Sequence, residues 1–188
     1  HGLPNVEQVP ANHLKFYLCF SEAMERGEVF RHLSLAEIDE KGFPVRQVQE
    51  PFREVELWDE TFTRLTLWFH PGRQKPGVNL NVELGPVLEE GRRYRLDVSP
   101  EWKTESGARL KGDRFKLFRA GPVDDTQPDP SRWKFSLDRE GQGRFHLTWG
   151  ELLDPVSARK RIEVVRQDGS SVKFSPLAIS AQGIRFPF

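Results

Sequence analysis

The feature that most constrains the fold of this chain is a long internal repeat. Residues 14–45 and residues 143–172 follow the same plan. In each copy an alternating apolar run ends in an aromatic residue, which is Phe20 in the first copy and Trp149 in the second. A small residue, a Glu, an apolar pair, a second alternating run and a Gly turn then follow in that order. Self-similarity with so long a period is typical of tandem domains, and period-two alternation is typical of β-strands.

Alternation of apolar and polar residues predicts an all-β chain, because helical periodicity is scarce. In residues 13–20 the side chains of Leu14, Phe16 and Leu18 fall on one face, which is the pattern of a half-buried strand. Turn signals that contain Gly separate the strands, and this regular spacing favours an antiparallel sandwich. Further strands are predicted at residues 29–38, 64–69, 94–98 and 114–118.

Charge and cysteine content exclude several classes of function. The 28 basic and 28 acidic side chains cancel, so nothing favours nucleic acid or an anionic membrane as a partner. Apolar stretches are strand-sized and interrupted by charges, so we expect no transmembrane segment. A single cysteine, Cys19, excludes an internal disulfide and a cysteine-based zinc site. With no leader of the signal-peptide kind, the chain is expected to be cytosolic or a mature or trimmed product.

A segment rich in Pro and Asp predicts a division of the chain. Residues 121–131 cannot sustain a strand or a helix, so we expect a fairly stiff linker there. It separates a sandwich over residues 1–120 from a shorter unit over residues 132–188. Half a sandwich leaves an unpaired edge. The sequence leaves open whether the second unit is cut short, docks on the first, or borrows strands from a partner, as in a strand-sharing homodimer.

The segments PANHLKFYLCFSEAM, ELWDETFTRLTLWF, LEEGRRYRLDV and SGARLKGDRFKLF resemble bacterial Ig-like domains of the surface-layer type. The resemblance covers residues 10–120, and residues 133–188 in part. It implies an Ig-like antiparallel β-sandwich followed by an incomplete second Ig-like unit. It further implies a non-catalytic structural or interaction module of an exported or lipid-anchored bacterial protein, working outside the cytoplasm on a protein or cell-surface partner. In such domains Tyr94 would be a tyrosine-corner residue whose hydroxyl anchors a loop crossover.

The N-terminal histidine supports an alternative function. The amino group and imidazole of His1 offer two nitrogen ligands for copper, which a second histidine would complete as a brace. His1-Gly2 before an Ig-like sandwich is similar to the mature ends of lytic polysaccharide monooxygenases and CopC-type copper carriers. The CopC-type Asp-x-His has no counterpart in residues 102–107, and His-Gly is also what a trimmed tag leaves. We therefore favour no cofactor, with copper as the alternative. The candidate second ligands are His13, His32 and His70.

Residues 70–81 are predicted to form a long cationic loop bracketed by two Pro-Gly turns. Its cations suit a carboxylate or sulfate, and its amides suit a sugar or peptide. A solvated connection is the favoured interpretation, with ligand binding as the alternative. The candidate ligand-binding residues are Trp68, Arg73, Lys75, Asn79 and Asn81.

Two tryptophans, Trp58 and Trp102, suggest a carbohydrate-binding accessory domain as a further alternative. Packing in the core or at its rim is the favoured interpretation for both. Catalysis is not expected, because no nucleophile elbow, zinc helix, dinucleotide motif or phosphate-binding loop is present. Cys19 has no base specified near it in the sequence, so an inert thiol is favoured.

Overall fold

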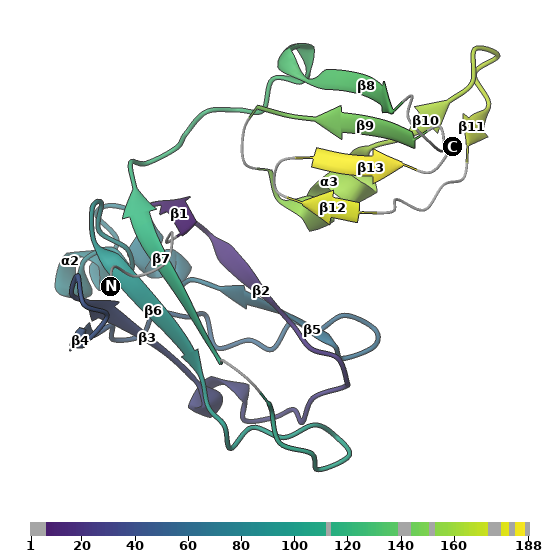
Figure 1. Cartoon of the computed structure of the whole chain (residues 1–188). Coiled ribbons are helices and arrows are strands. Elements are labelled where there is room, and N and C mark those ends of the chain that lie inside the picture. The colour runs from purple at the N-terminus through teal and green to yellow at the C-terminus, as the bar shows by residue number, and fades with distance from the viewer. Residues whose placement is uncertain are drawn as a thin grey trace. The chain divides into compact units, whose positions relative to one another are not determined.

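A computed structural model describes residues 7–111, 114–138, 144–150, 153–172, 178–180 and 183–186. The chain divides into two compact units, His1–Asp124 and Asp125–Phe188 (Figure 1). Both units consist mainly of strands with few short helices, so the prediction of an all-β, sandwich-like fold is confirmed. The division falls inside the segment that is rich in Pro and Asp. No helix in the described part of the chain has the length and apolar character needed to span a membrane.

The first unit contains a five-stranded sheet in the order β1-β7-β6-β3-β4 (Figure 1). Strand β1 runs parallel to β7, and the other neighbours are antiparallel. The bounds of these strands are β1 Glu7–Pro10, β3 Leu33–Ile38, β4 Pro44–Gln47, β6 Arg93–Val98 and β7 Phe115–Gly121.

A second layer is formed by β2 (Lys15–Cys19) and β5 (Arg64–Trp68), which pair in antiparallel fashion. Isolated bridges from Phe52 to Phe69 and from Trp58 to Leu65 widen this layer. Short helices lie in the connections: a 3-10 turn η1 (Val29–His32), α1 (Pro71–Gln74) and α2 (Asn79–Leu84).

The core of the first unit lies between the two layers. The rings of Phe16 and Phe118 meet edge to face at a centroid distance of 5.0 Å, and Phe16 contacts Phe69 in the same way at 5.6 Å. Such aromatic contacts add to the free energy gained by burying apolar area. At the end of the unit the chain is tied back to its beginning, because Asn12 and Asp124 exchange two hydrogen bonds of 3.0 and 3.1 Å.

The second unit contains a four-stranded sheet in the order β12-β13-β9-β8 and a separate hairpin, β10-β11. Its helix α3 (Pro155–Arg161) begins after Asp154, whose carboxylate accepts a hydrogen bond from the Val156 N–H at 3.2 Å. An Asp at the N-cap with Pro at the first helical position is a favoured helix start. The remaining bounds are η2 Pro130–Arg132, β8 Lys134–Asp138, β9 Arg144–Thr148, β10 Val164–Val165, β11 Ser171–Val172, β12 Ala178–Ser180 and β13 Gly183–Phe186.

The internal repeat has a structural counterpart. In the first copy β2 is followed by η1 and then by the antiparallel pair β3-β4, and in the second copy β9 is followed by α3 and the antiparallel pair β10-β11. Each copy therefore has the order strand, helical segment, hairpin.

Two sequence predictions differ from the structure. The strand predicted at residues 29–38 begins with η1, so only its second half is extended. The prediction of a loop at residues 70–81 is wrong in its secondary structure, because this segment contains α1 and the beginning of α2. His70 provides the cap of α1, since its side chain accepts a hydrogen bond from the Gly72 N–H, and Pro71 occupies the first helical position.

Tyr94 makes a hydrogen bond of the kind that the resemblance implies for it. Its ring is fully buried, and its hydroxyl oxygen accepts a hydrogen bond of 2.8 Å from the Glu89 N–H. The bond links β6 to the loop that precedes it. Burial raises the pKa of this hydroxyl, so it stays protonated and keeps its place in the core.

Candidate functional site

The inner face of β7 changes from charged to apolar along the strand. Lys116 pairs with Leu96, and Phe118 pairs with Tyr94, so Lys116 and Phe118 point to the same side of the sheet. Phe118 and Ala120 are buried there, whereas Arg114 and Lys116 remain partly exposed. The first half of the strand therefore places cations at positions where its second half places core residues.

A groove of about 560 Å³ opens beside these cations. It lies between β2 on one side and the beginning of β7 with its preceding loop on the other. The volume falls within the usual range of ligand pockets, about 300 to 1,000 Å³. Its floor is apolar and is formed by Leu18, Phe20, Met24, Leu96, Val98 and Leu110.

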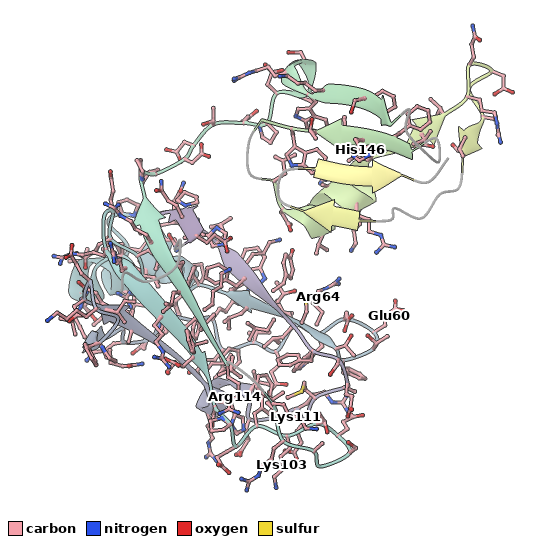
Figure 2. All side chains as sticks on the ribbon, in the orientation of Figure 1. Glu60, Arg64, Lys103, Lys111, Arg114 and His146 are labelled. Carbon is pink, nitrogen blue, oxygen red and sulfur yellow. The ribbon has the colours of Figure 1, made fainter. Side chains whose placement is uncertain are left out.

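The rim of the groove is mainly cationic. Glu22 is the one acidic residue among the described lining residues. Figure 2 labels Lys111 and Arg114 at the same end of the first unit, together with Lys103. The lining cations are Arg109, Lys111, Arg114 and Lys116, and we call them the rim cations.

Two rim cations are engaged by exposed carboxylates. Lys116 forms an ion pair with Glu7, and Arg109 lies 3.6 Å from the Glu101 carboxylate. Because these side chains are largely exposed, such pairs contribute little free energy. Arg114 donates a hydrogen bond of 3.1 Å to the Leu110 carbonyl oxygen, which positions it at the base of its loop.

Lys111 is the most available rim cation. It is exposed, and no carboxylate of the described residues forms an ion pair with it.

The sequence contains a signal for the groove in the alternation of residues 114–120, where cations take two inward positions. That signal was missed because period-two alternation alone does not show which edge of a sandwich stays open.

The loop that carries part of the rim is held firmly. Its turn is closed by Thr104, whose hydroxyl oxygen accepts a hydrogen bond of 3.1 Å from the Ala108 N–H. Backbone hydrogen bonds join Glu105 to Ala23 and Glu25 to Lys103. The groove is thus built on a rigid support, as binding sites usually are.

The described lining residues of the groove include a thiol but no histidine beside it. Cys19 is exposed on its wall, but the described lining residues contain no histidine that would act as a base. A cysteine or serine nucleophile needs such a partner or a lowered pKa. The arrangement of an apolar floor and a charged rim suits binding.

The structure places Arg73 in the interior of the unit. Its guanidinium donates hydrogen bonds to the carbonyl oxygens of Gly85 at 2.9 Å, Leu84 at 3.0 Å and Pro86 at 2.7 Å, and also to that of Gln49. All of these partners are backbone groups. Arg73 is only 2% exposed, so it ties two loops together and is not presented to a ligand.

The other residues proposed for this region do not gather into one site. Lys75 and Asn79 are exposed, and the Asn81 side chain donates to the Arg73 carbonyl oxygen at 2.6 Å. Trp68 is half-buried, with the Lys15 ammonium 5.1 Å from its ring centroid. None of these residues lines the groove.

The tryptophans are packed, as the favoured interpretation of the sequence predicted. Trp102 is 1% exposed, and its indole N–H donates to the Glu25 carbonyl oxygen at 2.9 Å. Trp58 is half-buried, with ring centroid distances of 6.1 Å to Phe20 and 6.0 Å to Trp102. The buried ring of Trp102 has no face on which a sugar would stack.

The histidines proposed for copper have separate surroundings. The His13 ring packs 4.7 Å from Phe16, and desolvation lowers its pKa from the usual 6.5. His32 stacks on Trp102 at 5.5 Å, and His70 Nδ1 is taken by the Gly72 N–H. His1 lies outside the described residues, so the copper site stays a prediction. In the described part of the chain no group of three or more metal-binding side chains occurs.

Comparison with known proteins gives no relative: no family model, no curated protein and no solved structure matches the chain. The geometry of the groove therefore carries the functional argument.

Proposed function

We propose that the chain is a non-catalytic structural and interaction module whose first unit binds a partner protein in the groove between β2 and β7. The observation that carries the proposal is the combination of an apolar floor with the rim cations around a volume of about 560 Å³. Apolar area supplies free energy of binding, and a few placed polar groups supply orientation. The firm support of the rim loop favours a preformed site.

The resemblance to bacterial Ig-like domains of the surface-layer type supports an extracytoplasmic place for this module, in an exported or lipid-anchored protein. In that setting the first unit presents the groove, and residues 121–131 connect it to the second unit as a Pro-rich spacer. The proposed partner is a protein or a cell-surface component.

The proposal is tested by mapping peptide binding on the whole chain. A library of extended peptides with varied charge is screened against ¹⁵N-labelled protein, and amide shifts are followed in the nuclear magnetic resonance spectrum. We expect shifts at Cys19, Leu110 and Phe115, which line the groove. Shifts elsewhere only, or no response to any peptide, would overturn the proposed function.

A blocked variant sharpens this test. Ala108 lines the groove with an exposed side chain, so Ala108→Trp fills the groove without entering the core. The matched control is Lys75→Trp, which adds the same ring at an exposed position outside the groove. We expect the first variant to lose binding and the second to keep it.

A further inference from the structure

The groove exists because charges occupy inward positions of β7. Lys116 stands in the same phase as Phe118, and Arg114, which directly precedes β7, continues this phase through its backbone hydrogen bond with Val98. A cation cannot be buried without a partner at acceptable cost. The two layers therefore close around Phe118 and remain apart around Arg114. Inward-pointing charges on a strand are also a known means of keeping an edge from pairing at random.

Strand β7 has a backbone edge open to this groove. The Val98 N–H donates to the Arg114 carbonyl oxygen at 2.7 Å, so the pair of residues 98 and 114 is hydrogen-bonded. In an antiparallel ladder the next pair is not, which directs the N–H and C=O of Phe115 away from β6. Strand β1 pairs with β7 only from Phe118 onward. Among the described residues no strand covers the edge at Phe115.

Strand β2 presents a similar backbone position on the opposite wall. The Phe20 N–H donates to the Thr63 carbonyl oxygen at 2.8 Å, so the neighbouring residue Cys19 directs its N–H and C=O away from β5. Cys19 and Phe115 both line the groove. The groove is thus lined by two strand edges, that of β7 at Phe115 and that of β2 at Cys19.

The charges around the groove indicate which kind of peptide segment would bind there. Residues 103–119 contain six cations, Lys103, Arg109, Lys111, Arg114, Lys116 and Arg119, against the acidic Glu105 and Asp113. Asp113 lies outside the described residues. Since four of the cations line the groove, an acidic segment complements it electrostatically.

Resting on the proposed function, we propose that the groove binds an extended acidic segment of a partner protein, which adds as a strand to the edge of β7 at Phe115. Successive side chains of an extended segment point to opposite sides. One set points to the inner face, where Arg114 and Lys116 stand, and the other points to the outer face, where the apolar ring of Phe115 is exposed. The preferred segment therefore alternates apolar with acidic residues. Backbone hydrogen bonds supply affinity in this mode, and the alternate side chains supply specificity.

The test uses the chain's own cysteine as a reporter. Cys19 is the single cysteine of the chain, it is exposed, and it lies on the groove wall. The rate of its alkylation by iodoacetamide is measured on the full chain with synthetic peptides of about eight residues, the length of an ordinary strand. The peptides alternate Val with Glu, with Gln or with Lys. We expect the Val-Glu peptide alone to slow alkylation.

The variant Lys111→Glu tests the charge argument at the most available rim cation. We expect it to weaken binding of the Val-Glu peptide about tenfold, because an attraction becomes a repulsion. The matched control is Lys75→Glu, which changes the net charge equally at a position outside the groove. Thermal unfolding of both variants shows that the fold is retained, since both side chains are exposed.

The outcomes separate this inference from the proposed function. Equal protection by the Val-Gln peptide would overturn the acidic preference but leave the groove as a peptide site. Protection by no peptide would overturn both, and the rim cations would then serve only to keep the edge unpaired. Concentration-dependent protection without peptide, with a dimer in sedimentation, would assign the groove to a second copy of the chain and overturn the inference.

Discussion

The two halves of the β7 inner face form an internal comparison. At Phe118 the sandwich is closed, with Phe16 and Tyr94 in ring contact at centroid distances of 5.0 and 5.6 Å. At Lys116, two residues earlier on the same face, the layers stay apart and a groove opens. The strand, the sheet and the neighbouring β6 are the same in both halves. The difference teaches that side-chain chemistry decides how far this sandwich closes.

The closed half should give the largest loss of stability. Phe118 is fully buried, so Phe118→Ala removes its apolar contacts and leaves a cavity. We expect the free energy of unfolding to fall by about 4 kcal/mol, as measured by urea denaturation. A loss below about 1 kcal/mol would mean that this half is as loosely packed as the groove, and the comparison would fail.

Arg73 tests whether a buried cation can be part of a closed region. In Arg73→Met the carbonyl oxygens of Leu84, Gly85 and Pro86 lose their shared donor. We expect a loss of about 3 kcal/mol in the free energy of unfolding, because unsatisfied buried acceptors are costly. The matched control Lys75→Met, at an exposed position just after α1, should change the value by less than about 0.5 kcal/mol.

In the open half, replacing a cation by an apolar residue should raise the free energy of unfolding. Lys116→Leu gives up an exposed ion pair with Glu7 and gains an apolar side chain in an inward position. We expect the free energy of unfolding to rise by up to about 1 kcal/mol, while protection of Cys19 by the Val-Glu peptide is lost. Destabilisation on this substitution would show that the cation is needed for the fold and would contradict the comparison.

The smallest expected effect is a pH dependence at the closed end, where His13 packs on Phe16. Its pKa in the folded protein is lowered by desolvation from the usual 6.5, against smaller contributions from the Lys15 backbone and the Glu7 carboxylate, which raise it. As the pH falls below 6.5, the His13 imidazole binds a proton more readily in the unfolded chain than in the folded chain. Stability therefore decreases with falling pH through this window.

The measurement for His13 is urea denaturation between about pH 8 and pH 5, centred on the histidine range. We expect His13→Gln to flatten the dependence relative to the parent chain. The control Lys75→Gln, at an exposed position, should change the free energy of unfolding by less than about 0.5 kcal/mol across the same range. Equal slopes in the parent and His13→Gln would contradict the assigned cause.

The alternation of apolar and polar residues predicted most of the strands of the first unit. Alternation predicted residues 64–69 and 94–98, and the structure has β5 at Arg64–Trp68 and β6 at Arg93–Val98. Strand β1 was not predicted, because four residues hold no clear alternation and their partner lies more than a hundred residues away. Helix α3 was also missed, although Asp154-Pro155 is a sequence signal for a helix start.

The groove could not be predicted from the local sequence pattern, because it depends on which strands face each other. The sequence shows Arg114 and Lys116 in phase with Phe118, but it does not show that β2 lies opposite them. Conversely, Arg73 was conspicuous as a loop cation, and only the fold shows that backbone carbonyls surround it. The identity of a charged residue indicates that it needs a partner, whereas tertiary structure decides whether that partner is internal.

The parallel pairing of β1 with β7 has a mechanical consequence. Strand β1 begins at Glu7 and β7 ends at Gly121, and these residues stand at opposite ends of the paired stretch. Tension applied along the chain at these two points pulls the strands lengthwise past each other. The interstrand hydrogen bonds and the Asn12–Asp124 link then share the load in shear, instead of opening one after another. The first unit should therefore resist tension between these two points in shear.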